Sequence, residues 1–227
     1  MKREIKTTAD GSKTIFIDEL QEGYHSHNGA LQEAEHVFIK NGINKVKNYE
    51  INILELGFGT GLNALVTINE FLKNDKNHII NYFTLEKYPV NNEEIVELNY
   101  AKHFTFENAQ EIYQKIHELE WNKTHEILPN FFFTKYNLDF FKIKEINLPA
   151  INLVYYDCFG AKVQPDLWEK PLFEIVKSKM KDGGLLTTYS SKGSVRRILK
   201  ELNFEVTKLE GPKGKREMIN AVLKEPS

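Results

Sequence analysis

The amino-acid sequence predicts an α/β fold built on a mostly parallel sheet, and three observations carry this prediction. From residue 50 onward, short apolar runs of strand length alternate with segments of helical periodicity. A glycine-rich turn follows the first run and opens the first of these helices. The last two apolar runs are joined by a turn alone, so we expect them to form an antiparallel hairpin at the C-terminal end.

The part of the chain before this alternation has a different character. We expect residues 1–48 to form an N-terminal extension packed on the main domain, which spans 49–227. Apolar and β-branched residues predict a short strand over 14–17. Apolar residues at helical spacing predict a helix over 29–40.

The elements of the main domain follow in chain order. Strands are expected over 51–56, 79–85, 131–136, 152–156, 185–189, 204–209 and 217–223. Helices are expected over 62–73, 93–100, 109–119, 167–181 and 194–202, with 182–184 (Asp-Gly-Gly) ending the fourth. Strand–helix alternation places helices on both faces of a parallel sheet. A mostly parallel sheet with one antiparallel C-terminal strand is the layout of class I methyltransferases, a Rossmann-like fold.

Composition bounds the classes of protein that fit this chain. It has 227 residues, 30 basic and 32 acidic, and 41% are hydrophobic, which excludes disordered and fibrous classes. The net charge of −2 excludes a wholly basic nucleic-acid binder but allows a local basic patch. The single cysteine, Cys158, cannot form an internal disulfide, which favours a reducing cytoplasm. We expect this cysteine to be a small buried residue and not a nucleophile. No apolar run suits a signal peptide or a membrane span, and the seven histidines lack metal-ligand spacing, so we expect neither membrane nor metal as a partner.

The glycine-rich turn is the first candidate site. It reads Glu-Leu-Gly-Phe-Gly-Thr-Gly-Leu-Asn over 55–63, with an acid two residues before its first glycine. Glycines let a ligand approach the backbone, and a helix N-terminus offers free N–H groups. The spacing differs from the dinucleotide and P-loop patterns. It therefore favours adenosyl-methionine, which has no phosphate, over a phosphate cradle.

Three acids each come at or just after the end of a predicted strand, where ligands of such sheets bind. Glu86 can accept hydrogen bonds from both ribose hydroxyls, or it is a surface acid paired with Lys87. Asp139 can accept from an adenine amino group, or it caps a turn. Asp157 can bind a substrate amine and manage its proton, or it is a structural acid satisfied by backbone N–H groups.

Two basic clusters lie near the same predicted edge. They are Lys192, Arg196, Arg197 and Lys200, and Lys208, Lys213, Lys215 and Arg216. Such runs are commonly a solvated helix face, and the alternative is contact with nucleic-acid phosphates. Both interpretations stay open from the residues alone.

Five stretches, in chain order, resemble one family. They are 29–38, 55–63, 85–89, 157–173 and 189–197, and 214–218 (Gly-Lys-Arg-Glu-Met) resembles the family's closing pattern. The combination of the glycine-rich turn with Asp157, Phe159, Pro165 and Trp168 is far more specific than a generic methyltransferase loop. On these residues the sequence resembles the methyltransferase domain of the bifunctional tRNA 5-methylaminomethyl-2-thiouridine biosynthesis proteins (MnmC) and its stand-alone MnmD-like form.

The resemblance implies an S-adenosyl-L-methionine-dependent tRNA methyltransferase. Its substrate would be the primary amine of 5-aminomethyl-(2-thio)uridine at wobble position 34, and its product the 5-methylaminomethyl base. Asp157 would be catalytic. The resemblance implies cofactor contacts by Tyr24, Ser26, Glu33, Glu55, Gly57, Phe58, Gly59, Gly61, Asn63, Glu86, Lys87 and Asp139. It implies substrate contacts by Phe159, Lys162, Tyr189, Lys192, Arg196, Arg197, Lys215 and Arg216.

Bifunctional members carry an FAD-dependent oxidase domain that this sequence does not contain, so we expect no FAD and action on the aminomethyl form alone. Two other functions remain open. One is a methyltransferase or aminopropyltransferase for a small amine, which needs no basic patch. The other is a non-enzymatic module that binds adenosyl-methionine or RNA, in which Asp157 and the intact loop would have no purpose.

Overall fold

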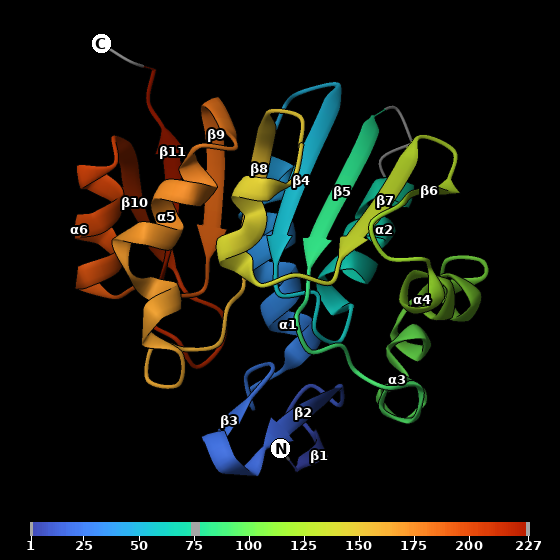
Figure 1. Ribbon diagram of the computed structural model, residues 1–227. Coiled ribbons are helices and arrows are strands. Elements are labelled where there is room, and N and C mark those ends of the chain that lie inside the picture. The colour runs from blue at the N-terminus through green and yellow to red at the C-terminus, as the bar shows by residue number, and fades with distance from the viewer. Residues whose placement is uncertain (1, 74–77, 226–227) are drawn as a thin grey trace.

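The computed structural model describes residues 2–73 and 78–225, and it contains a large eight-stranded sheet and a small three-stranded sheet (Figure 1). The large sheet consists of β4 (Glu50–Leu56), β5 (Ile79–Leu85), β6 (Thr124–Leu128), β7 (Phe131–Tyr136), β8 (Ile151–Tyr156), β9 (Met180–Thr188), β10 (Phe204–Glu210) and β11 (Glu217–Leu223). The small sheet consists of β1 (Arg3–Thr7), β2 (Lys13–Ile17) and β3 (Glu22–Gly23). The α-helices are α1 (Ala30–Ala34), α2 (Leu62–Lys73), α3 (Asn92–Leu98), α4 (Ala109–Glu118), α5 (Lys170–Lys177) and α6 (Gly193–Glu201), and α1 continues as a π-helix over Glu35–Lys40. Short 3₁₀ turns cover Asp18–Leu20, Ile43–Lys45, Tyr100–His103, Phe140–Glu145 and Pro165–Trp168.

The strand order of the large sheet is β10-β11-β9-β8-β4-β5-β7-β6. The five strands from β9 to β7 are parallel, whereas β11 runs antiparallel to both β9 and β10. From β4 the chain moves outward through β5 to β7 and later returns to β8 and β9 on the other side. The topological switch point therefore lies between β4 and β8, where ligands of such sheets bind. The predicted fold class, including the reversed C-terminal strand, is confirmed.

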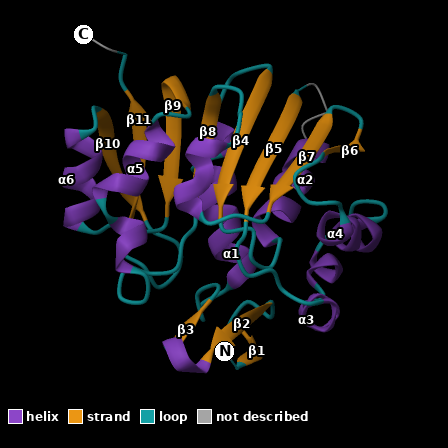
Figure 2. Cartoon of the chain, viewed as in Figure 1, coloured by secondary structure: helices purple, strands orange, loops and turns teal. Residues whose placement is uncertain are grey.

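Helices cover both faces of the sheet, which is why its central strands are apolar almost throughout (Figure 2). Neighbouring residues on a strand point to opposite faces, so Tyr155 and Tyr156 belong to different cores. Tyr155 packs with α1, α2 and α4 in one core, and Phe38 of the π-helix lies 4.9 Å from it, ring to ring. Tyr156 packs with α5 and α6 in the other, stacked on Phe173 at 4.6 Å.

The N-terminal part contacts the large sheet directly. Ile15, Val37 and Phe38 are buried in the same hydrophobic cluster as α2. The hydroxyl of Thr187 on β9 donates to the backbone oxygen of Val37 (3.1 Å). The strand expected over 14–17 and the helix expected from 29 are both present, as β2 and α1 with its π-helical continuation. The division of the chain at 48/49 stays a prediction.

Two segments differ from the sequence-based expectation. The helix expected over 167–181 is a 3₁₀ turn followed by α5, which ends at Lys177. The Asp-Gly-Gly stretch at 182–184 lies inside β9, where the pairing with β8 shifts register, so it forms a bulge and is not a helix stop. The edge strand β6 was not expected, because its Thr-His-Glu start is too polar to show a strand pattern. It pairs antiparallel to β7 and adds a second reversed strand.

Candidate active site

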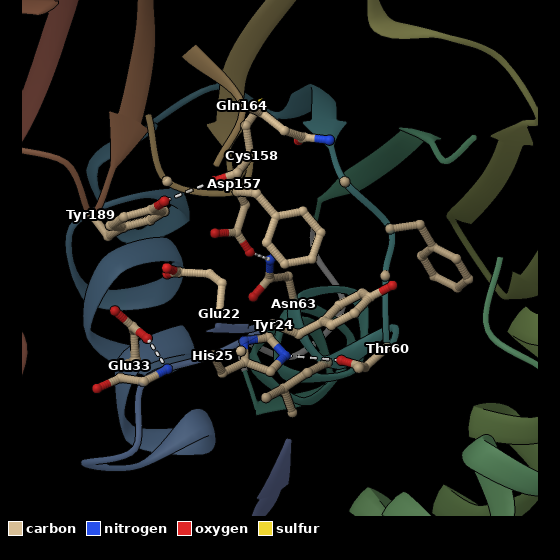
Figure 3. A pocket seen from close by; sticks show the side chains of 18 of the residues that line it. Glu22, Tyr24, His25, Glu33, Thr60, Asn63, Asp157, Cys158, Gln164 and Tyr189 are labelled. Carbon is tan, nitrogen blue, oxygen red and sulfur yellow. Dashed lines mark hydrogen bonds between the residues drawn. The ribbon is translucent and has the colours of Figure 1, made fainter. Parts of the chain in front are cut away.

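A cavity of about 450 Å³ lies at the carboxyl ends of the central strands. Segments that follow β4, β5 and β8 form its floor, and residues 21–28 close it from the N-terminal side. Figure 3 shows side chains from these separate segments pointing into one space. The cavity is large enough for a nucleoside-sized ligand. Its position is the one expected from the switch point between β4 and β8.

The glycine-rich turn forms the cavity wall after β4. Gly57 and Phe58 donate their N–H groups to the backbone oxygen of Leu85 (3.1 and 3.0 Å), which ties the turn to the end of β5. Gly59 has a φ of +48°, and a Cβ at this position would lie 3.0 Å from the ring of Tyr24. Both the backbone conformation and the close aromatic ring therefore favour glycine here.

Glu86 follows β5 and lines the cavity beside this turn. Its Oε2 accepts from the N–H of Gly59 (3.0 Å), and its Oε1 accepts from the N–H of Tyr88 (2.7 Å). The carboxylate is thus held in a fixed orientation by two backbone groups, one of them in the glycine-rich turn. It is not paired with Lys87, whose Nζ instead contacts Asp139.

Asp139 caps a turn, which is one of the two functions considered from the sequence. Its Oδ1 accepts from the N–H of Phe141 (3.1 Å) and so caps the short 3₁₀ turn that follows. Its Oδ2 pairs with Lys87 Nζ at 3.0 Å. Both side chains line the cavity together with Phe140. A partly exposed ion pair of this kind adds little stability.

Asp157 follows β8 and lines the cavity beside the glycine-rich turn. Its Oδ2 accepts from Asn63 Nδ2 (2.8 Å), as Figure 3 shows. Burial, together with the negative charge of Glu33, raises the pKa of Asp157 to about 7, although the Asn63 hydrogen bond and Lys215 oppose this shift. A carboxyl group with a pKa near neutrality can both accept and release a proton at physiological pH.

The carboxylates of Glu22 and Glu33 lie with that of Asp157 on one side of the cavity (Figure 3). We call these three carboxylates, together with Tyr189, the acidic corner. Glu33 is buried, accepts from the N–H of Ser26 (2.8 Å) and forms an ion pair with Lys215. Glu22 lines the same wall. The ammonium group of Lys215 lies 3.9 Å from the centre of the Tyr189 ring. The corner thus already holds one amine between a carboxylate and an aromatic face.

The remaining wall is aromatic and neutral. Tyr24 and Phe159 meet edge to face, with ring centres 4.9 Å apart. His25 Nε2 and the hydroxyl of Thr60 lie within hydrogen-bonding distance (2.9 Å). Burial lowers the pKa of His25 to about 4, so the ring is neutral at pH 7.

The structure brings most of the residues expected at the site into one place. The cavity is lined by Tyr24, Ser26, Glu33, Gly57, Phe58, Gly59, Asn63, Glu86, Lys87, Asp139, Asp157, Phe159, Tyr189 and Lys215. Seven others do not line it: Glu55, Gly61, Lys162, Lys192, Arg196, Arg197 and Arg216. Of these, Lys162, Lys192, Arg197 and Arg216 are exposed, whereas Glu55 is buried beneath the glycine-rich turn.

Sequence reasoning did not single out Glu22, His25, Thr60 or Gln164, which also line the cavity. Their signal was weak. Glu22 and His25 lie close to Tyr24 in a polar stretch without periodicity, and Thr60 lies between two glycines that carry the recognisable pattern. The roles of all these side chains remain predictions.

Within residues 2–73 and 78–225, no helix is long and apolar enough to cross a bilayer. The same residues hold no group of three His, Cys, Asp or Glu side chains arranged to bind a metal ion.

The sheet order, the glycine-rich turn at the switch point and the cavity beside it define a class I methyltransferase fold. Comparison with known proteins then gives the family. A model of S-adenosyl-L-methionine-dependent methyltransferases matches residues 103–224, more than half of the chain, and the chain belongs to this family. The prediction of an enzyme that uses S-adenosyl-L-methionine is confirmed with it.

Individual relatives are more specific. The chain is 29% identical to the tRNA 5-methylaminomethyl-2-thiouridine biosynthesis bifunctional protein MnmC of Leptospira interrogans, covering 91% of this chain and 33% of that protein. It is 27% identical to the MnmC of Pseudoalteromonas atlantica, over 97% of this chain and 33% of that one. The crystal structure of MnmC2 from Aquifex aeolicus superposes with a TM-score of 0.78 at 26% identity, covering 99% of this chain and 72% of that chain. The chain spans about a third of the length of the curated relatives it matches. The resemblance expected from the sequence motifs is confirmed.

Proposed function

We propose that this chain transfers the methyl group of S-adenosyl-L-methionine to the primary amine of 5-aminomethyl-(2-thio)uridine at the wobble position of tRNA. The observation that carries the proposal is the alignment of nine tenths of the chain or more with proteins named for tRNA 5-methylaminomethyl-2-thiouridine biosynthesis. The acidic corner supports it independently, because carboxylates beside an aromatic ring suit an amine.

The cavity fits the cofactor. A Cβ on Gly57 or Gly59 would meet the Asp157 backbone at 2.8 Å or the Tyr24 ring at 3.0 Å, so the turn is kept free of side chains where a ligand would approach. Glu86 would accept from the ribose hydroxyls, and Asp139 would accept from the adenine amino group. S-adenosyl-L-methionine, when bound, supplies a methyl group on a positively charged sulfur.

Asp157 would act on the acceptor amine. An amine attacks a methyl group only as the neutral base, with its lone pair in line with the bond that breaks. A carboxylate with a pKa near 7 can accept a hydrogen bond from that amine, aim its lone pair and take up the proton that the product ammonium releases. Proton transfer to Asp157 and loss of the proton to water before binding are both compatible with this geometry.

Exposed cations near the acidic corner would contact the tRNA backbone. Lys192 opens α6, three residues after Tyr189, and Arg197 follows on the same helix. Arg216 is next to Lys215, which lines the cavity. Phosphate contacts by such side chains supply affinity without reading sequence. This arrangement suits an RNA whose target base enters the cavity while its backbone stays on the surface.

The test is methyl transfer from labelled S-adenosyl-L-methionine to tRNA from a strain that lacks the modification. Nucleosides from the digested tRNA should carry the label as 5-methylaminomethyl-uridine or its 2-thio form. Asp157→Asn serves as the matched inactive control. Label on another nucleoside would contradict the substrate, and cofactor binding without any labelled tRNA would favour a small amine as acceptor.

A further inference from the structure

A buried chain of polar side chains runs beneath the glycine-rich turn and ends at Asp157. Glu55 on β4 is fully buried, and Asn63 at the start of α2 is 3% exposed. Asn63 Nδ2 donates to Asp157 Oδ2 (2.8 Å), and the hydroxyl of Thr84 donates to Glu55 Oε2 (2.6 Å). The side chains of Glu55 and Asn63 also interact with each other. The amide of Asn63 therefore lies between the interior carboxyl group of Glu55 and the carboxylate of Asp157, which faces the cavity. Figure 3 shows the hydrogen bond between Asn63 and Asp157.

Two acceptor atoms in the middle of this chain lack a donor. Oε1 of Glu55, Oδ1 of Asn63 and the hydroxyl of Tyr82 are buried, and none of the three atoms makes a hydrogen bond of ordinary length in the described part of the chain. An amide oxygen and an ionised carboxylate only accept, so neither atom can satisfy the other. The Tyr82 hydroxyl, which faces Glu55, can donate to only one of these two acceptors. A proton on Glu55 supplies the second donor, because the carboxyl group can then donate to the amide oxygen.

The surroundings of Glu55 favour that proton. The ionisable groups that face it are Tyr82 on β5, Tyr155 on β8 and Asp157 after β8, and none of them is a cation. The α2 side chain that faces it is a neutral amide. Burial is the main cause that raises the pKa of Glu55 to about 8, and the charge of Asp157 adds to it, while hydrogen bonds with Thr84, Asn63 and Tyr82 oppose it. Glu55 is therefore mainly a neutral acid at pH 7.

We propose that Glu55 is a positioning residue of the methyl transfer, which as a neutral acid donates from Oε1 to Oδ1 of Asn63 and so keeps the amide NH₂ group on Asp157. The inference rests on the function proposed above, because it takes Asp157 as the group that meets the acceptor amine. The amide has two orientations. With its oxygen held by Glu55, its NH₂ group faces Asp157. Once Glu55 ionises, it can no longer donate to the amide oxygen, and its carboxylate attracts the NH₂ group instead. The amide can then turn its oxygen toward Asp157, where the oxygen repels the Asp157 carboxylate.

Glu55→Gln separates this role from a merely structural one. The glutamine amide can donate to Asn63 at every pH, its carbonyl oxygen can accept from Thr84, and it cannot ionise. We expect the kcat of the wild type to fall as the pH rises above about 8 and the kcat of Glu55→Gln to hold up to about pH 10. Glu55→Ala removes the donor and is expected to lower kcat at pH 7 about tenfold or more, with a smaller effect on the KM for tRNA.

Two variants serve as controls. Glu50→Gln makes the same change on the same strand, but Glu50 is exposed at the opposite end of β4, so its pH profile should match the wild type. Asn63→Leu removes the linking amide at similar volume. It should lower kcat as Glu55→Ala does, and adding Glu55→Gln to it should restore nothing. Melting temperatures at pH 7 show which variants fold.

Two results would overturn the inference. One is a Glu55→Gln variant that keeps the wild-type fall in kcat at alkaline pH. The other is a Glu55→Gln variant that melts like the wild type but loses as much activity as Glu55→Ala. If the wild type itself methylates no tRNA, the proposed function fails instead, and the inference is tested through the pKa of Asp157 by carboxyl NMR. That pKa should rise in Asn63→Leu and stay near the wild-type value in Glu55→Gln; any other pattern contradicts the inference.

Discussion

Asp157→Asn is expected to stop catalysis while leaving the shape of the site unchanged. In the native protein the carboxylate accepts from Asn63 Nδ2 (2.8 Å) and faces the cavity. An asparagine oxygen can still accept that hydrogen bond, but the side chain cannot carry a charge or take a proton. We expect kcat to fall about a hundredfold to ten-thousandfold, the usual range for a positioned acid–base group.

The same substitution should stabilise the fold at neutral and alkaline pH. Burial is the main cause that raises the pKa of Asp157 from 3.8 to about 7 in the folded state. The folded protein binds this proton more tightly than the unfolded chain, so the stability it contributes is fully present below about pH 4 and lost as the pH rises through about 7. A shift of about three units corresponds to about 4 kcal/mol, an upper limit because solvent in the cavity screens the charge. Asparagine avoids this loss.

Chemical denaturation of both proteins at about pH 5 and about pH 8 measures the difference in the free energy of unfolding. The advantage of the variant should be larger at the higher pH. Calorimetric titration with S-adenosyl-L-methionine shows whether the cofactor site is intact. A variant that is less stable than the wild type at the higher pH would refute the reasoning, since it would make Asp157 a structural acid satisfied by its surroundings.

Three further outcomes are expected. Gly59→Ala should weaken S-adenosyl-L-methionine binding about tenfold or more, whereas Gly183→Ala, also at positive φ but with open space around it, should lower stability without changing the dissociation constant. Lys215→Met removes a positive charge that lowers the pKa of Asp157. The acidic limb of the kcat/KM profile should therefore move to higher pH, and a move to lower pH would contradict the assignment. Arg216→Ala should raise the KM for tRNA and reduce the salt dependence of binding by about one unit in log–log slope, with the KM for the cofactor unchanged; loss of cofactor affinity would argue against a phosphate contact.

The sheet was predictable because its strands are buried on both faces and read as continuous apolar runs. β5, β7 and β11 occupy the expected residues, and β4, β8 and β10 differ by one residue at an end. β6 was not predicted from the sequence, because an edge strand needs no apolar pattern. The helix expected over 167–181 failed because apolar periodicity continues through the turn into β9, and its two glycines serve a bulge. Local pattern cannot distinguish these cases, because strand pairing decides them.

The site was predictable where a residue is tied to a strand end. The glycine-rich turn, Glu86, Asp139 and Asp157 converge because parallel strands end at one edge. Segments that reach the cavity from elsewhere carry no such rule. His25 lies in an irregular stretch far from the turn in sequence, and nothing in its spacing indicates that it contacts Thr60 at 2.9 Å.

The N-terminal part is better understood as a wall of the site than as an appendage. Tyr24 lies over Gly59, so packing against this N-terminal segment favours a residue without a side chain at position 59. Glu33, at the start of the helical region, brings a second carboxylate to Asp157 and raises its pKa. Removing these residues would open the cavity to water and separate the two carboxylates, which would return the pKa of Asp157 toward its ordinary value. The resemblance of residues 29–38 to the family then has a physical reason, since Glu33 of this helix raises the pKa of Asp157, the group that we propose meets the amine.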